Sequence, residues 1–280
     1  MAEKTLRILC FGAHPDDADF RFAGFAMRYR ALGHQVKFVS VTNGDHGHQS
    51  QGGVTLVRRR HSEAMAAAKI ADVEYEVLDI SDTELEANLE NRKTIIRIIR
   101  QYVPDLILSH RACDYHADHR AVGQLIQDAS YLLTVPHVCP LTPHLTTSPV
   151  VAYLFDRFTS PEPFRADVIL DTDELFERKA RMGACHESQV YEWLPYNGNY
   201  LESVPTEPEA RFRWFAARHQ QRFMIDANLL RPTLKQMYGE ERGGAILTTE
   251  ALMFSEYGLS VTPEIRRRLF PFIPWKETRD

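Results

Sequence analysis

The most constraining feature of this sequence is a short, almost uninterrupted apolar run, residues 6–12, that ends abruptly in the polar segment 13–17. An apolar run of this length without alternation is typical of a strand buried on both faces, as in a parallel sheet. A helix-compatible segment follows over residues 19–32, stops at Gly33 and precedes a second strand-like run at 36–41. The start of the chain therefore predicts a βαβ unit.

The same alternation continues along the chain. Further strands are predicted at 75–80, 106–109, 150–155 and 168–170. Further helices are predicted at 54–71, around 95–103, at 173–184 and at 209–228, and another follows the polar segment 111–119 and runs to about residue 133. Alternating strands and helices are typical of an α/β protein with a Rossmann-like, doubly wound, mostly parallel sheet and helices on both faces. We predict that residues 1–190 form this core and that residues 191–280 form a C-terminal extension packed on the same domain.

Charge and cysteine content exclude several classes of protein. The chain has 38 acidic and 33 basic residues, a formal net charge of -5, which argues against a nucleic-acid partner because phosphate contacts need a basic excess. Four widely spaced cysteines in 280 residues are too few for a secreted disulfide framework. No apolar run approaches the roughly 20 residues of a membrane helix. We therefore expect a cytoplasmic protein without a transmembrane segment and, because closed oligomers are common, a homo-oligomer.

Two clusters of histidine and aspartate follow predicted strands. The first is His14-Pro15-Asp16-Asp17, after the first strand, and the second is His116-Ala117-Asp118-His119, shortly after the fourth. In open α/β sheets, ligands bind outside the carboxyl ends of the strands, so the two clusters can converge. Imidazoles and carboxylates are metal ligands, and crowded carboxylates repel one another unless a cation neutralises them. The sequence therefore predicts a metal site at this edge of the sheet.

The spacing within the clusters predicts the ligands. Pro15 favours a helix-like turn in which His14 and Asp17, at i and i+3, face the same way. We predict that His14, Asp17 and His119 bind the metal and leave a fourth position for water, as catalytic zinc sites do. Zn²⁺ is the default for these ligands, although Fe²⁺, Co²⁺ or Mn²⁺ would also fit. Cys113 is a competing ligand by spacing, but we interpret it as a small loop residue.

The remaining residues of the two clusters receive catalytic roles. Asp16 points away from the ligands and is predicted to act as the general base on the attacking water. His116 is free to contact the substrate and donate to the developing oxyanion. Asp118 is predicted to hold the ring of His116 in orientation.

At these residues the chain resembles the LmbE-like, or PIG-L, zinc-dependent N-deacetylases. The family's motifs are A-H-P-D-D, T-x-G-E/D, R-x-x-E-A, H-x-D-H and K…H-x-S-Q, which stand here at 13–17, 42–45, 60–64, 116–119 and, with Lys179, 186–189. Ala117 stands where the family commonly has proline. The resemblance covers about residues 5–190. It implies zinc on His14, Asp17 and His119, Asp16 as general base and later acid, and His116 polarising the amide.

The resemblance also implies that Arg60 contacts a substrate hydroxyl or phosphate, although from the residues alone Arg60 reads as a solvated helix residue. We group Asp45 and His186 with Arg60 as candidate substrate-binding residues, and the sequence leaves open whether His186 approaches the site or supports its wall. The loop 44–53 either binds sugar hydroxyls or is a polar surface loop. The aromatic segment 191–200 either stacks on sugar rings or covers a subunit contact or core edge.

Together these features predict a zinc-dependent hydrolase that removes an N-acyl group from an amino sugar such as N-acetylglucosamine or from a glycoconjugate. Among the acyl groups, N-acetyl is the one that we expect. An amidase acting on a thiol conjugate or another non-sugar amide would use the same residues and stays open. A catalytically silent carbohydrate-binding protein on the same fold would lack Asp16 or a ligand, and all are present. A dinucleotide-dependent oxidoreductase is disfavoured because the first strand is not followed by G-x-G-x-x-G.

Overall fold

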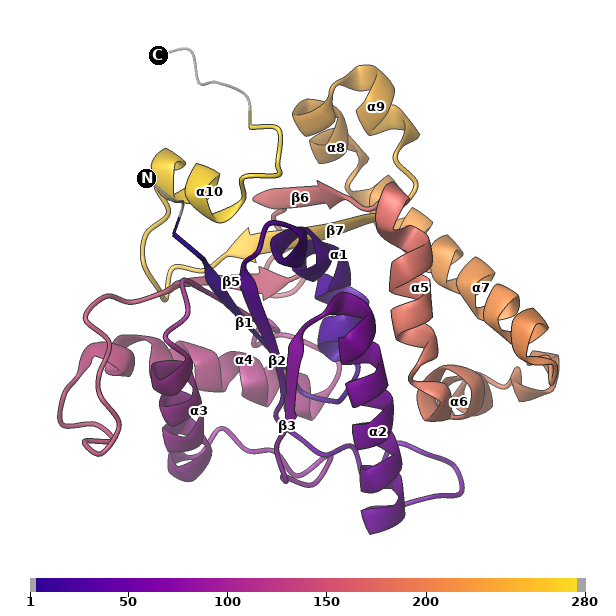
Figure 1. The fold of residues 1–280 in the computed structure, drawn as a ribbon, viewed down its shortest axis with the longest axis horizontal. Helices are drawn as coiled ribbons and strands as arrows, with labels where there is room; N and C mark the ends of the chain where they lie inside the picture. The colour runs from indigo at the N-terminus through magenta and orange to yellow at the C-terminus, as the bar shows by residue number, and fades with distance from the viewer. Residues whose placement is uncertain (1–3, 276–280) are drawn as a thin grey trace.

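The computed structural model describes residues 4–275, whose strands form one seven-stranded sheet (Figure 1). The strands lie in the order β3-β2-β1-β4-β5-β7-β6. Their bounds are β1 (Arg7–Gly12), β2 (Gln35–Ser40), β3 (Glu74–Val77), β4 (Leu106–Ser109), β5 (Val150–Leu154), β6 (Val168–Asp171) and β7 (Thr249–Phe254). The predicted α/β class with a mostly parallel sheet is confirmed.

The helices cover both faces of the sheet (Figure 1). They are α1 (Asp17–Ala31), α2 (Gly53–Ala71), α3 (Leu89–Tyr102), α4 (Ala117–Ser130), α5 (Phe176–Ala184), α6 (Leu194–Asn197), α7 (Pro208–Leu229), α8 (Arg231–Tyr238), α9 (Glu240–Ala245) and α10 (Pro263–Leu269). Short 3-10 turns lie at Tyr131–Thr134, Asp173–Leu175 and Leu201–Ser203, and a π-helical turn at Ser188–Trp193. No helix in the described part of the chain is both long and apolar enough to cross a membrane.

Strand β1 shows why a continuous apolar run is needed at the centre of the sheet. Ile8 and Cys10 face one core cluster, which contains residues of α1, α2, α5 and α10. Leu9 and Phe11 face the other, which is built on α3 and α4. All four side chains are fully buried. Successive side chains of a strand point to opposite faces, so a strand covered on both sides must be apolar at every position.

The connections place a topological switch point between β1 and β4. From β1 the chain moves outward to β2 and β3, and then returns to β4 on the other side of β1, with all of these neighbours parallel. The loops after β1 and β4 therefore leave the same edge of the sheet and diverge to opposite faces. This is where an open α/β sheet forms its binding crevice.

Strand β7 was not predicted from the sequence. It lies between β5 and β6 and pairs antiparallel with both. Its short run, Thr249–Phe254, follows a turn-rich segment, and long-range antiparallel pairing leaves no local signal for it. The segment that follows residue 190 therefore supplies a strand to the sheet.

A buried ion pair ties the extension to the core. Lys179 Nζ of α5 lies 2.7 Å from Glu250 Oε1 of β7, and both side chains are buried. Glu250 also accepts the backbone N–H groups of Gly24 and Phe25 at 2.9 and 3.0 Å. Burial lowers the pKa of Lys179, and the nearby Glu250 carboxylate counteracts that effect. Lys179 belongs to the K…H-x-S-Q motif, and in this structure it supports the fold.

We expect Lys179→Met to destabilise the protein by about 3–5 kcal/mol, because it leaves the Glu250 carboxylate buried without its counter-charge. Urea unfolding followed by circular dichroism measures the change. The matched control is Lys235→Met, whose partner Glu240 is solvent-exposed and whose loss should cost less than about 1 kcal/mol. Equal effects of the two substitutions would contradict the assignment.

Candidate active site

The turn between β1 and α1 carries three of the predicted site residues. The backbone N–H groups of Ala13 and His14 donate to Asp17 Oδ2 at 2.9 and 2.8 Å. The His14 carbonyl accepts the N–H of Asp16 at 2.8 Å. Gly12 permits this tight turn, since a Cβ there would lie 2.8 Å from the Cβ of Asp17. The turn thus fixes Oδ2 of Asp17, while Oδ1 faces His119.

His14, Asp17 and His119 come together as the predicted ligand set. His14 Nδ1 lies 3.3 Å from His119 Nε2 and 3.6 Å from Asp17 Oδ2, and His119 Nε2 lies 3.4 Å from Asp17 Oδ1. The ligand atoms of a tetrahedral ion with bonds of about 2.1 Å are themselves about 3.4 Å apart. The nitrogens of His14 and His119 thus stand at the separation that a tetrahedral cation requires, and each lies near a different oxygen of Asp17.

His110, which directly follows β4, lies beside this set. Its Nε2 is 3.2 Å from Asp17 Oδ2, and its ring stacks on that of His119 with 4.0 Å between centroids. Burial lowers the pKa of His110, which favours the neutral ring. The described chain offers three overlapping groups of metal-ligating side chains: His14 with His116 and His119, His14 with Asp82, His116 and Asp118, and Asp17 with His110 and His119.

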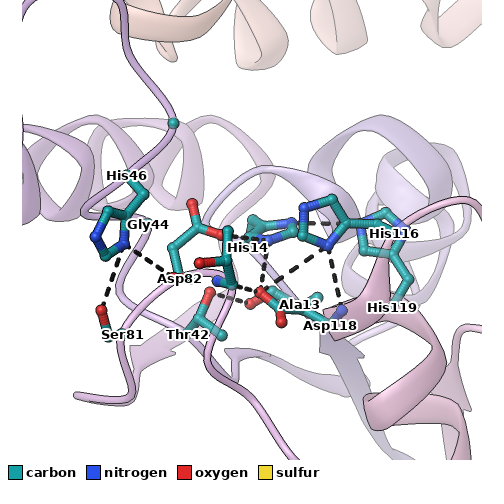
Figure 2. A network of polar contacts seen from close by, with 12 residues as sticks. Ala13, His14, Thr42, Gly44, His46, Ser81, Asp82, His116, Asp118 and His119 are labelled. Carbon is teal, nitrogen blue, oxygen red and sulfur yellow. Dashed lines mark hydrogen bonds and ion pairs between the residues drawn. The ribbon is translucent and has the colours of Figure 1, made fainter.

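Each predicted ligand imidazole has a carboxylate behind it. His14 Nε2 lies 3.2 Å from Asp118 Oδ2 and 3.0 Å from Asp82 Oδ1, and His119 Nδ1 lies 3.1 Å from Asp114 Oδ1. Figure 2 shows Asp82 and Asp118 beside His14, next to the rings of His116 and His119. A carboxylate in this place fixes the ring and its tautomer. It leaves Nδ1 of His14 and Nε2 of His119 free to bind a cation.

The site concentrates negative charge. Burial disfavours an imidazolium, but Asp118, Asp17 and Asp82 outweigh it and raise the pKa of His14 well above its usual value. Burial also opposes the charged form of Asp17, yet the neighbouring imidazoles, that of His119 foremost, lower the pKa of this carboxyl well below its usual range. Asp118 Oδ1 is buried without a hydrogen-bond partner. Carboxylates gathered this closely require a cation or a proton on His14.

His116 caps the N-terminus of α4 and lines the cavity beside the ligands. Its Nδ1 accepts the N–H of Asp118 at 3.2 Å, so the neutral ring carries its proton on Nε2. Burial, and then the charges of His14 and His119, lower the pKa of His116. The residue is therefore placed as a neutral N–H donor.

The role predicted for Asp118 needs a correction. Its carboxylate lies 4.0 Å from His116 Nδ1 but 3.2 Å from His14 Nε2. The reason is local: the backbone N–H of Asp118 already occupies Nδ1 of His116. Asp118 therefore orients the ligand His14, and the ring of His116 is held by the backbone.

Arg60 and Asp16 form an ion pair in the cavity wall. Arg60 Nη2 lies 3.3 Å from Asp16 Oδ2, and its Nη1 lies 4.0 Å from Asp82 Oδ2. Gly44, at φ 71°, makes room for this side chain, since a Cβ there would lie 2.4 Å from Arg60 Nη1. Arg60 is 2% exposed, so it is not the solvated helix residue that the residues alone suggest. It lines the cavity as the partner of Asp16, and its substrate contact stays a prediction. It keeps Asp16 at the cavity surface in a fixed orientation.

Asp45 and His186 are not among the residues that line the cavity. Asp45 accepts the Ser81 hydroxyl at 2.9 Å and the N–H of Asp82 at 2.8 Å, which braces the segment that carries Asp82. His186 is fully buried, with its Nε2 3.4 Å from Asp19 Oδ1 on α1. In this structure both residues support the wall, which for His186 is one of the two roles that the sequence left open, and a substrate contact of either residue stays a prediction.

The sequence analysis missed His110, Asp82 and Asp114. All three lie in loops that follow parallel strands, Asp82 after β3 and the other two after β4. The strand-end rule, applied to every loop and not only to the two motifs, would have singled them out.

These residues line one end of a cavity of about 900 Å³. The extension forms much of the rest, through Trp193, Tyr200 and α7, so part of the aromatic segment borders the cavity. The loop 44–53 is anchored to the extension because His48 Nε2 lies 2.8 Å from Glu192 Oε2. Both the loop and the aromatic segment thus help to enclose the site.

Comparison with known proteins places this geometry in a family. Residues 9–130 match the sequence profile described as "PIG-L: GlcNAc-PI de-N-acetylase". The match to this PIG-L (LmbE-like) profile covers less than half of the chain. The matched residues include all three predicted ligands, together with Asp16, Arg60 and His116.

Individual proteins extend the likeness beyond residues 9–130. A diacetylchitobiose deacetylase of Thermococcus kodakarensis is 28% identical over 208 residues, which span 68% of this chain and 74% of that protein. The N,N'-diacetylchitobiose deacetylase of Pyrococcus horikoshii, solved with its inhibitor MPG, has a TM-score of 0.69 at 20% identity, covering 91% of this chain and 85% of its own. GalB, the 4-carboxy-2-hydroxymuconate hydratase of Pseudomonas putida KT2440, has a TM-score of 0.68 at 20% identity, covering 92% and 98%. The two structures show a shared fold.

We expect Asp114→Ala to weaken zinc binding by about 10–100-fold, because it removes the carboxylate that orients His119. Competition with a chromophoric chelator measures the affinity. Asp128→Ala is the matched control, since this aspartate lies on α4 and pairs with Arg92 at 3.7 Å away from the ligands. An unchanged affinity in the Asp114 variant would show that His119 needs no such support or is not a ligand.

Proposed function

We propose that this protein is a metal-dependent N-deacetylase that removes an N-acetyl group from an amino sugar or a glycoconjugate. The observation that carries the proposal is the triangle of side chains formed by His14, Asp17 and His119. His14 Nδ1 and His119 Nε2 lie 3.3 Å apart, and the two oxygens of Asp17 lie 3.6 Å from His14 Nδ1 and 3.4 Å from His119 Nε2. Asp16 is next to Asp17 in sequence. The names of the T. kodakarensis and P. horikoshii relatives support the same reaction class. We propose zinc as the metal, with Fe²⁺, Co²⁺ or Mn²⁺ as alternatives for the same ligands.

The chain's own residues can carry the proton transfers of amide hydrolysis. A divalent cation at this site supplies Lewis acidity toward an amide carbonyl and a water molecule. Asp16, held by Arg60, takes the proton of the attacking water and later gives it to the leaving amine. The Nε2–H of His116 donates to the oxygen that becomes negative when water adds to the carbonyl. The C–N bond then breaks to give acetate and the free amine.

A hydratase is a second candidate, because GalB has the same fold and its name describes the addition of water without release of an amine. The ligand triangle and Asp16 could activate water for either reaction. An amidase acting on a non-sugar amide is a third candidate with the same residues. The three differ in their products, so a product assay separates them.

The test pairs metal content with product release. We expect about one divalent ion per chain by mass spectrometry, and amine release from N-acetylglucosamine, N,N'-diacetylchitobiose or their conjugates that a chelator abolishes and zinc restores. Amine release only from non-sugar amides would favour the amidase. A protein that binds no metal even after reconstitution would overturn the proposal.

We expect Asp16→Asn to keep its metal and to lose about 10²–10⁴-fold in kcat, because an amide cannot accept the proton of the attacking water. Amine release and metal content are measured on the same preparation, with Asp128→Asn as the control. A kcat close to that of the unaltered protein would remove Asp16 from the mechanism.

A further inference from the structure

Six arginines line the cavity that also contains the predicted metal ligands, and two of them, Arg60 and Arg111, are paired with Asp16 and Asp156. The other four form one wall: Arg21 of α1, Arg157 after β5, and Arg218 and Arg222 of α7. Among them lies a single carboxylate, Asp226, which is 2% exposed. Arg157 Nε is 2.6 Å and Arg21 Nη1 is 3.5 Å from its oxygens. One aspartate cannot neutralise four guanidinium groups, so this wall carries excess positive charge.

Other acidic groups of the cavity do not remove that excess. Asp156 is occupied by Arg111, whose Nε and Nη2 lie 2.6 and 2.5 Å from its two oxygens. Asp16, Asp82 and the other aspartates at the opposite end are engaged by Arg60 and the histidines. The positive charge of this wall is therefore available to a bound molecule.

Arg218 and Arg222 are the two members without an ion pair among the residues the structure describes. They are one turn apart on α7, so their side chains leave the same face of the helix, and both are exposed to solvent. The Arg218 guanidinium lies over the rings of Tyr200 and Trp214, 4.2 and 5.2 Å from their centroids. The charge of Arg21 is the largest influence on Arg222 and lowers its pKa, which reflects repulsion between like charges.

Tyr115 connects this wall to the predicted metal ligands. Its ring centroid is 5.5 Å from that of His119 and 5.7 Å from that of His116. Tyr115 and Arg222 both line the cavity. The arginines and the metal-ligating histidines are thus within reach of one ligand, in a cavity of about 900 Å³ that falls in the usual range for small-molecule sites.

We propose that the arginine wall, centred on Arg218 and Arg222, binds an acidic group of the substrate, a carboxylate or a phosphate. The inference rests on the proposed deacetylase function and narrows its substrate to an acidic conjugate of the N-acetyl amino sugar. Guanidinium groups present a planar pair of donors that matches both kinds of oxyanion, and the aromatic rings hold Arg218 in place before the ligand arrives. A neutral chitin fragment would leave these charges unpaired.

The test uses a matched pair of β-glycosides of N-acetylglucosamine, one ending in a propanoate and the other in the neutral propanol. We expect the acid to be deacetylated with a kcat/KM at least tenfold higher. In the double variant Arg218→Gln, Arg222→Gln, the ratio between acid and alcohol should fall toward one. N-acetylglucosamine 1-phosphate is the third substrate and tells whether phosphate is preferred over carboxylate.

The matched control is Arg213→Gln, since Arg213 is exposed on the same helix and does not line the cavity. It should keep the preference for the acid. The single variants at 218 and 222 give the same readout with half the charge change, should the double variant fail to fold. Equal kcat/KM for acid and alcohol in the unaltered protein, or a preference that survives in the double variant, overturns the proposal.

A binding measurement separates this proposal from the proposed function. Isothermal titration of the two de-N-acetylated glycosides, the acid and the alcohol, requires no turnover. At least tenfold tighter binding of the acid, lost in the double variant, supports the anion site even if no amide is cleaved. Amine release with equal affinity for both glycosides leaves the deacetylase standing and removes the anion site.

Discussion

The buried carboxylates at the carboxyl ends of β1, β3 and β4 are the constraint on which the rest of this structure depends. Asp17, Asp82, Asp114 and Asp118 are all shielded from bulk water within one small volume, and each faces an imidazole. Burying charged groups is costly unless opposite charge is supplied. The parallel sheet determines where this occurs, because its switch point brings the loops after β1 and β4 to one place. A cation bound there would supply the opposite charge that these carboxylates need.

Several residues of the family motifs act as supports at a distance from the ligands. Glu63 on α2 accepts both the N–H and the hydroxyl of Ser188 at 2.8 and 2.6 Å, which fixes the turn that begins at Ser188. Asp45 holds the backbone of Asp82. Hydrogen bonds of this kind lock the orientation of catalytic groups before a substrate arrives, so the motifs encode a preorganised site and not only its ligands.

The fold and the centre of the site were predictable, because both follow from local patterns. Continuous apolar runs identify central strands, and the two motifs at strand ends identified His14, Asp17 and His119, which lie within 3.6 Å of one another. What depends on distant pairing was not predictable. Nothing local in Thr249–Phe254 indicates an antiparallel strand between β5 and β6. Likewise, His186 is a histidine, as two of the predicted ligands are, and only its complete burial in the structure shows that it is a wall residue.

The predicted metal ligands and most of the proposed substrate-binding arginines lie in different parts of the chain. The profile match ends at residue 130 and includes His14, Asp17 and His119. On the opposite wall of the same cavity, Arg157, Arg218 and Arg222 lie beyond that match, and Arg21 lies within it. Structures of a hydratase and of a deacetylase share this fold. If α7 binds the substrate as proposed, substitutions in this helix change substrate preference and leave the predicted ligands after β1 and β4 in place.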